Sequence, residues 1–343
     1  MIDIDYCASS YCALRYVATP DTGWSEQHVP ILPLQEHRPQ VSVRGADDIL
    51  DHLQSVCSAV TNDRSCGLLL SGGIDSAILA ALMPSSTPTF TIRFEAENAI
   101  DESLVAQKYA DDLGLSNTVV NVRWSDYQAN IDRLMIHKNS PLHPVEVALF
   151  CAGRVAKQAG IETLLTGNGA DSTFGGLDRL LSVDWDFESF VERYTFLDPR
   201  PVLRRPRAID GIFEPYRTVS GIDVVKFLKE VHGIGIVQMF ENALNCAGCA
   251  MVSPYEDLVL DVPLDIDRIR GGEPKYLLQE VFQHLFPNQT APEKIAFARP
   301  VSIWLRDWTG PTSDIFVDNL DIDQLSGEQR WIVYCLDRFL ALL

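Results

Sequence analysis

The sequence predicts an α/β fold in which a parallel sheet is followed by a helical C-terminal region. Over roughly the first half of the chain, apolar runs typical of buried strands alternate with segments of helical periodicity. Beyond Gly176 the strand-like runs give way to helical segments with irregular joins. The 343 residues, 46% of them hydrophobic, suffice for a sizeable core.

The individual elements follow from apolar periodicity. Residues 1 to about 45 predict a short strand or hairpin and an irregular connection, because Tyr6, Tyr11, Tyr16 and Val17 precede a proline-containing stretch. Strands are expected at 68–70, 88–94, 118–122 and 162–166. Helices are expected at 45–60, 77–82, 101–113, 127–138, 145–159, 187–194, 224–231, 236–243, 275–285 and 330–342.

The composition restricts the classes of partner. A net charge of −19 gives no electrostatic basis for wrapping nucleic acid, which is bound largely through Lys and Arg. No apolar run is long enough to cross a membrane, and the first residues lack the pattern of an export signal. We therefore expect a cytoplasmic protein whose eight scattered cysteines are reduced thiols.

The segment Ser71-Gly72-Gly73-Ile74-Asp75-Ser76 stands between a predicted strand and a predicted helix. Adjacent glycines allow a sharp turn and close approach to a ligand, and a helix start offers unpaired N–H groups and a positive dipole end. This favours an anion site, most simply for phosphate. It is not a Walker A loop, because the Lys-Ser or Lys-Thr pair is missing. A bare Gly-Gly could be only a turn, but Asp75 and Ser76 favour the phosphate site.

A second loop, Thr166-Gly167-Asn168-Gly169-Ala170-Asp171, follows another predicted strand. In parallel sheets, ligands bind at the carboxyl ends of the strands. We therefore expect both loops to contribute to one site.

These segments resemble those of a known family. The first resembles the PP-loop of ATP pyrophosphatases, and residues 166–176 resemble the SGEGxDExFGG segment of asparagine synthetases. Residues 253–257 are similar to a degraded form of that family's Arg-x-Pro-Phe-Leu-Asp stretch. Lys275 and the segment 292–300 are similar to its helix-borne lysine and its Arg-x-Lys-x-Gly-Phe-x-x-Pro pattern. The resemblance spans about residues 46–310.

The resemblance implies a sheet of the PP-loop, HUP-like type that binds ATP and Mg²⁺. Asp75 and Asp171 would hold the metal, Lys294 would contact the α-phosphate and pyrophosphate, and Lys275 is a candidate second phosphate contact. The other residues expected to bind the nucleotide are Ser71, Gly72, Gly73, Ser76, Ile92, Gly167, Asn168 and Gly169. The chain would divide into an N-terminal strand, loop and lead-in helix (1–57), an ATP-binding α/β domain (58–185) and a mainly helical synthetase region (186–343).

Several positions depart from the family pattern. Ile2 stands where the glutaminase domain of asparagine synthetases has its cysteine, and the stretch before the first loop is too short for that domain. Nitrogen would therefore come from free ammonia, an amine substrate or a separate glutaminase. Asn168 replaces a glutamate, where β-lactam synthetases carry a tyrosine, and an amide has no titratable proton near neutral pH. Ser172 and Val252 also differ, which puts aspartate in doubt as the substrate.

The expected function is an ATP-dependent ligase that adenylates a small-molecule carboxylate, releases pyrophosphate and passes the acyl group to ammonia or an amine. One alternative is a PP-loop sulfur transferase with Cys246 and Cys249 as carriers; another is a non-catalytic nucleotide-binding subunit. The basic stretch 200–207 is a solvated loop or, alternatively, a lid. The sequence leaves the oligomeric state open.

Overall fold

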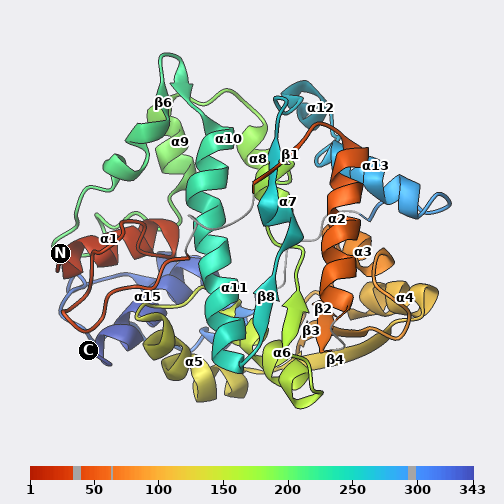
Figure 1. Ribbon diagram of the computed structural model, residues 1–343. Coiled ribbons are helices and arrows are strands. Elements are labelled where there is room, and N and C mark those ends of the chain that lie inside the picture. Colours follow the sequence, from red (N-terminus) through yellow and green to blue (C-terminus); the bar gives the residue numbers. More distant parts are fainter. Residues whose placement is uncertain (34–39, 63–64, 293–298) are drawn as a thin grey trace.

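The computed structural model describes residues 1–33, 40–62, 65–292 and 299–343. Within them, one central sheet has five parallel strands in the order β4-β3-β2-β5-β8 (Figure 1). The strands are β2 (Cys66–Leu69), β3 (Pro88–Phe94), β4 (Ser116–Val122), β5 (Thr163–Leu165) and β8 (Ala250–Val252). A parallel sheet with helices confirms the predicted α/β class, although β8 was not expected.

Helices cover both faces of this sheet. Side chains alternate between the two faces along each strand, so consecutive apolar residues make both faces apolar. Leu68 belongs to one core cluster, whereas its neighbour Leu69 packs against the other. The first cluster takes in α2 (Ala46–Thr61), α3 (Ile74–Ala81), α4 (Ser103–Leu113) and α13 (Tyr276–Leu285). The second takes in α5 (Trp124–Lys138), α6 (Glu146–Gln158), α11 (Gly233–Ala247) and α15 (Gly327–Leu340). These bounds confirm the corresponding predicted helices to within a few residues.

The strand order places the site. The first strand of the sheet, β2, lies in its middle, with β3 and β4 on one side and β5 and β8 on the other. Connections therefore reverse direction between β2 and β5, and such a switch point leaves a crevice at the carboxyl ends of the two strands. The loops that begin at Ser71 and Thr166 both start there.

The N-terminal segment differs from the prediction of a strand or hairpin, because α1 (Ile4–Leu14) is a helix. The Asp3 side chain caps it by accepting a hydrogen bond from the Tyr6 N–H. Cys7 and Tyr11, four residues apart, are fully buried on the same face. Tyrosine and cysteine are common in strands, but tertiary burial of one helical face outweighs this weak preference.

The helical C-terminal region also contains one correction. The two helices predicted at 224–231 and 236–243 form one continuous helical segment: α10 (Val224–Phe227), a π-helical turn η3 (Leu228–His232) and α11. Gly235 does not break it, and a Cβ there would lie 2.8 Å from the Tyr16 ring, so this glycine permits close packing. The predicted helix at 187–194 is confirmed as α9 (Phe187–Tyr194).

The remaining elements are short. The strands are β1 (Val41–Val43), which pairs with β9 (Leu258–Leu260), and β6 (Arg217–Thr218), which pairs with β7 (Gly221–Ile222). The α-helices are α7 (Ala170–Thr173), α8 (Asp178–Leu181), α12 (Ile266–Arg270) and α14 (Val301–Trp304). The 3-10 helices are η1 (Asp210–Ile212), η2 (Glu214–Tyr216), η4 (Pro254–Asp257) and η5 (Ile322–Gln324). The division into three parts remains a prediction.

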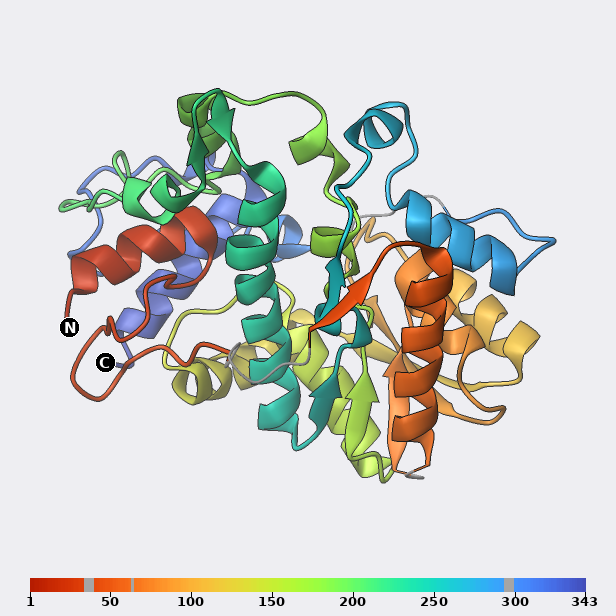
Figure 2. The ribbon, with the colours of Figure 1, turned by 45° about the horizontal axis from the view of Figure 1, so that its top comes forward.

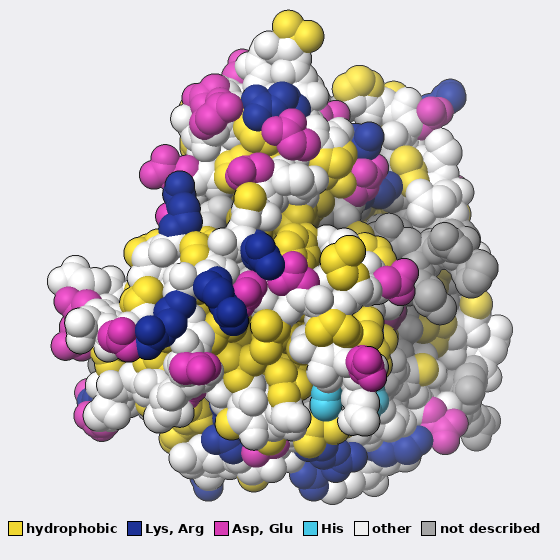
Figure 3. Space-filling view, turned by 90° about the vertical axis from the view of Figure 1, so that its left-hand side faces the viewer, with side chains coloured by type: hydrophobic (Ala, Val, Ile, Leu, Met, Phe, Trp, Pro, Cys, Tyr) yellow, Lys and Arg dark blue, Asp and Glu magenta, His cyan; other side chains and the backbone are white. Residues whose placement is uncertain are grey.

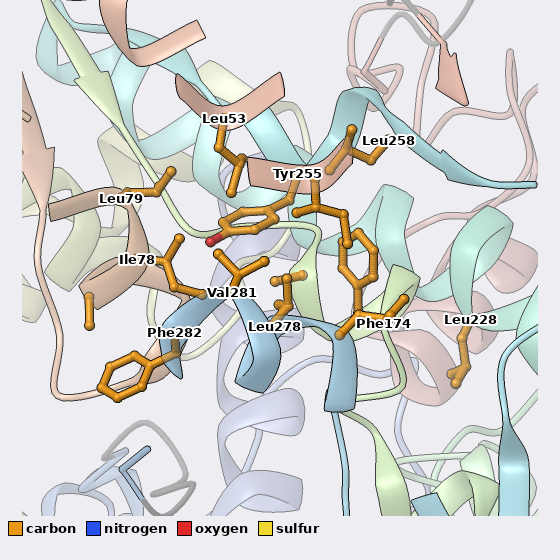
Figure 4. Close-up of a cluster of buried hydrophobic side chains, with 14 of the residues drawn as sticks. Leu53, Ile78, Leu79, Phe174, Leu228, Tyr255, Leu258, Leu278, Val281 and Phe282 are labelled. Atoms are coloured by element: carbon orange, nitrogen blue, oxygen red, sulfur yellow. The ribbon is translucent and has the colours of Figure 1, made fainter. Parts of the chain in front are cut away.

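A buried aromatic residue connects these layers beneath the site. Tyr255 of η4 lies among side chains from α2, α3 and α13, including Leu53, Ile78 and Val281 (Figure 4). Its hydroxyl donates a hydrogen bond to the Asp75 carbonyl at 2.9 Å. The same core therefore holds α13 against α3, and Figures 1 and 2 show α13 beside α2.

The surface beside the chain ends is of mixed charge. Basic and acidic side chains lie next to each other over the face in Figure 3. Within the basic stretch 200–207, each arginine has an acidic partner: Arg200 with Asp198, Arg204 with Asp318, Arg205 with Asp5, and Arg207 with Asp3. Among the described residues, no helix is long and apolar enough to span a membrane.

Candidate functional site

A cavity of about 900 Å³ opens at the switch point of the sheet. One end is lined by the two loops and by β3, and the other by residues of α9, α11 and the N-terminal segment. Its volume lies near the top of the range of roughly 300–1,000 Å³ for ligand pockets. The cavity therefore has room for a nucleotide and a second substrate.

The first loop is held by its own hydroxyl groups. Ser76 Oγ accepts a hydrogen bond from the Ser71 N–H at 3.0 Å and lies 2.9 Å from Ser71 Oγ. Gly73 directly precedes α3, so the N-terminal N–H groups of this helix lie beside the loop. Neither Gly72 nor Gly73 has a positive φ, so these glycines do not form a left-handed turn here.

Glu102 lines the cavity beside this loop, although its sequence position indicated only a helix N-terminus. Its Oε2 accepts a hydrogen bond from the Gly72 N–H at 3.3 Å. Burial raises the pKa of this carboxyl group. A phosphate bound to the same amide would take the place of Glu102.

The second loop packs directly against the first. A Cβ at Gly167 would lie 3.0 Å from Asp75 Cβ, so a glycine permits this approach. Gly169 has a φ of +91°, in the left-handed region that favours glycine. Asn168 is buried and lines the cavity, and within the described part of the chain its Nδ2 has no hydrogen-bond partner. An amide in this position can donate to a ligand.

Lys275 links the two loops. Its Nζ lies 2.6 Å from Asp75 Oδ2 and 2.9 Å from Asp171 Oδ1. Burial alone would lower the pKa of this ammonium, but the two carboxylates and their hydrogen bonds outweigh it, and the pKa is raised. Lys275 precedes α13 with a φ of +54°, an unusual conformation for a residue other than glycine. The structure thus brings together three of the predicted site residues.

A glycine leaves room for this cluster. A Cβ at Gly176 would lie 2.0 Å from Asp171 Oδ1 and 2.2 Å from Lys275 Cε, closer than real atoms approach. The packing of Asp171 against Lys275 therefore requires a glycine at position 176, the second of the glycine pair at 175–176 that the family segment also contains.

The donor set suits a cation that arrives with phosphate. Among the described residues, no group of three His, Cys, Asp or Glu side chains could hold a metal. Asp75 and Asp171 supply two hard oxygen donors on either side of one ammonium position. Mg²⁺ is usually held by one or two carboxylates together with substrate phosphates, so these residues fit the metal of a bound nucleotide.

Other predicted residues have different outcomes. Ile92 lines the cavity beside Thr91 and Phe94, at the end of β3 next to the loop strand β2. Lys294 lies outside the described residues. Neither Cys246 nor Cys249 lines the cavity; Cys249 follows α11, and burial raises the pKa of its thiol.

The far end of the cavity was not anticipated from the sequence. It is lined by polar and charged side chains: Arg15, His143, Tyr194, His232 and Arg299. Arg299 falls at a variable position of the family-like segment 292–300, and the other four carry no motif. The five side chains come from five separate segments of the chain. Because only the fold brings them together, no local sequence pattern could have indicated them.

Comparison with known proteins agrees with the resemblance of the two loops. Residues 49–212 match the family model described as asparagine synthase. The predicted resemblance is confirmed over residues 49–212. A Bacillus subtilis protein named asparagine synthetase [glutamine-hydrolyzing] 2 is 28% identical over 226 residues, which cover 60% of this chain and 29% of the relative. A Mycobacterium bovis protein, provisionally named a glutamine-hydrolysing asparagine synthetase, is 29% identical over 170 residues, covering 48% of this chain and 24% of the relative.

The chain thus spans about a quarter of the length of these curated relatives. Among solved structures, the ammonia-dependent NAD synthetase of Campylobacter jejuni is similar at 15% identity with a TM-score of 0.30, covering 57% of this chain and 96% of that one.

Proposed function

We propose that this protein is an ATP-dependent ligase that adenylates a carboxylate, releases pyrophosphate and transfers the acyl group to ammonia or an amine. The observation that carries the proposal is the convergence of Asp75, Asp171 and Lys275 beside the Ser71 loop. The match to the asparagine synthase family supports the same class of reaction.

The nucleotide would lie across the switch point. The phosphates would lie against the Ser71 loop and the start of α3, where backbone N–H groups and the helix dipole favour an anion. The base would lie near Ile92, whose strand end also lines the cavity. Mg²⁺ bound with ATP would be held by Asp75 and Asp171 and would neutralise charge on the phosphate oxygens.

In the first half-reaction, a carboxylate oxygen of the substrate attacks the α-phosphorus, and the bond from that phosphorus to the bridging oxygen breaks. Pyrophosphate leaves with the bridging oxygen and its electron pair. The Lys275 ammonium, which contacts Asp75 and Asp171 and has a raised pKa, would lie beside this position. It can therefore stabilise the charge that develops on the leaving group. The family pattern gives Lys294 the same task.

In the second half-reaction, the nitrogen attacks the acyl carbon, AMP leaves with the carboxylate-derived oxygen, and the nitrogen loses a proton. Asn168 cannot take that proton, but its Nδ2 can donate to an oxygen of the bound substrate. The departing phosphate of AMP or the solvent would then accept the proton. The nitrogen would come from free ammonia, an amine or a separate glutaminase.

The decisive experiment is product analysis with radiolabelled ATP. The proposal expects exchange of pyrophosphate into ATP with the correct acid, and AMP with pyrophosphate as the products once a nitrogen donor is added. Release of ADP and phosphate would reject it. Magnesium-dependent binding of ATP without exchange across a broad acid panel would favour the non-catalytic alternative.

The sulfur-transferase alternative has its own test. Neither Cys246 nor Cys249 lines the cavity. Changing both cysteines to serine should therefore leave exchange and turnover intact. Loss of turnover with retained folding would restore this alternative.

A further inference from the structure

Glu102 belongs to a different segment of the chain from the loop that it contacts. It directly precedes α4, and its Oε2 accepts a hydrogen bond from the Gly72 N–H at 3.3 Å. Glu102 also lines the cavity, together with Ser71 and Asp75. Its carboxylate therefore occupies an amide of the loop at which we expect phosphate to bind.

The three amides of this loop are bound by different kinds of acceptor. The Ser71 N–H donates to Ser76 Oγ at 3.0 Å, and the Gly73 N–H donates to Ser71 Oγ at 3.2 Å. Both hydroxyl groups are neutral and belong to the segment 71–76 itself. The Gly72 N–H is instead bound by a carboxylate, and a charged acceptor forms the stronger hydrogen bond. Of these three amides, that of Gly72 is the one that an anionic group already occupies.

The charge of Glu102 is not offset by a basic side chain. The residue is half-buried, and among the residues that the structure describes no lysine or arginine forms an ion pair with it. Burial raises the pKa of its carboxyl group, and the hydrogen bond from Gly72 opposes this effect. An unpaired carboxylate in this position repels the oxygens of a bound phosphate. Glu102 and a phosphate therefore exclude each other from the Gly72 amide.

The backbone of Glu102 is fixed, so only its side chain can leave the loop. Its carbonyl accepts hydrogen bonds from the N–H groups of Val105 and Ala106, both at 3.1 Å. A Cβ at Gly72 would lie 3.4 Å from the Cβ atoms of Glu102 and Val105, so the loop packs against the first turn of α4. Rotation about the side-chain torsions can move the carboxylate off the amide while α4 stays in place.

We propose that Glu102 competes with pyrophosphate for the Gly72 amide and thereby speeds the release of this product. The inference rests on the proposed function, in which pyrophosphate leaves from the Ser71 loop. ATP displaces the carboxylate when it binds. Once the bond to the α-phosphorus has broken, pyrophosphate no longer has the contacts made by the adenosine part of ATP. The Glu102 side chain then regains the amide. Glu102 acts on product release and takes no part in bond cleavage.

Calorimetric titration with inorganic pyrophosphate and Mg²⁺ tests the competition without an acyl substrate. Glu102→Gln keeps the size of the side chain and removes its charge. We expect this variant to bind pyrophosphate about tenfold more tightly than the unmodified protein, because a neutral competitor replaces a charged one. Radiolabelled pyrophosphate chased with unlabelled pyrophosphate should also leave the variant more slowly. A side chain that only supported the loop would have the opposite effect, since its loss would weaken binding.

Asp101→Asn is the matched control. Asp101 is exposed and carries the same charge one residue away, but its Oδ1 accepts a hydrogen bond from the Ser103 N–H at 2.9 Å. An asparagine can accept the same hydrogen bond, so this variant loses the charge and keeps the local structure. We expect its affinity for pyrophosphate to change little. Thermal unfolding checks the fold of both variants.

Unchanged or weaker pyrophosphate binding in Glu102→Gln would overturn the inference and leave the proposed function standing, since pyrophosphate would still bind. An equal increase in affinity in Asp101→Asn would also overturn it, because the effect would then come from net charge. Tighter binding with an unchanged dissociation rate would exclude the role in release. If neither pyrophosphate nor the α,β-methylene analogue of ATP binds to any of the three proteins, the proposed function fails together with the inference.

Discussion

Lys275 donates to Asp75 beside the Ser71 loop, with 2.6 Å between Nζ and Oδ2, although 200 residues separate them in the sequence. The contact joins the start of α13 to the start of α3, two helices packed in one core. It therefore couples the stability of the fold to the geometry of the site.

Asp75→Asn should both destabilise the protein and abolish activity. It leaves the buried Lys275 with only the partly exposed Asp171 as a carboxylate partner, and breaking a buried pair typically costs about 3 kcal/mol. Urea unfolding measures the loss. In the double variant with Lys275→Met, part of that stability should return while pyrophosphate exchange stays absent. Equal losses in the single and double variants would contradict the coupling.

Gly176→Ala should disrupt the same cluster from outside the charged residues. The added methyl group would overlap with Asp171 Oδ1 and Lys275 Cε. We expect a lower melting temperature and a fall in exchange rate of at least tenfold. Gly211→Ala is the control, because a Cβ there meets nothing within 4 Å and its φ is not in the left-handed region. If both variants show the same melting temperature and exchange rate, the close packing at Gly176 affects neither stability nor activity.

Lys294→Ala should slow chemistry more than it weakens binding. The family pattern places this lysine on the α-phosphate and pyrophosphate, where charge increases in the transition state. The exchange rate should fall by about 100-fold or more, while the Kd of the methylene ATP analogue changes by less than about tenfold. Lys226→Ala, which removes an exposed lysine, is the control variant. A loss confined to nucleotide affinity would assign Lys294 to ground-state binding only.

His143 should make stability depend on pH. Its pKa in the folded protein lies below the usual value of about 6.5, so below that pH the unfolded chain binds a proton that the folded protein does not. Stability is therefore lost as pH falls through about 6.5, by at most about 1.4 kcal/mol per pH unit for this one group. His143→Gln should reduce the drop in melting temperature between pH 7 and pH 5. An unchanged drop would show that other groups dominate.

Local pattern predicted most of the sheet and both loops, because buried strands and capped helices leave periodic signals within a few residues. The strand-loop-helix segment at Ser71 and the acidic loop ending at Asp171 lie where the sequence placed them. The prediction of a strand or hairpin at the N-terminus was wrong, because α1 is a helix whose burial depends on distant residues. One of these is Leu142, whose carbonyl accepts a hydrogen bond from the Tyr11 hydroxyl.

The far end of the cavity shows a different limit. Arg15 and Arg299 meet at Glu328 only after the chain has folded, and no spacing in the sequence reports on such a meeting. Motifs predict the part of a site shared by a family, whereas contacts between distant segments determine the part that differs.

The π-helical turn at 228–232 has a consequence for how this protein can vary. It places one surplus residue in the helical segment from Val224 to Ala247, which regular α-helical geometry would not need. Deleting one residue there would restore an unbroken α-helix, and α10 and α11 would keep the faces that they present, because the wide turn already absorbs the extra residue. His232 stands at the end of that turn and faces the cavity lining. A single-codon deletion would thus shift His232 at the far end of the cavity while the sheet and the loops at Ser71 and Thr166 stay as they are.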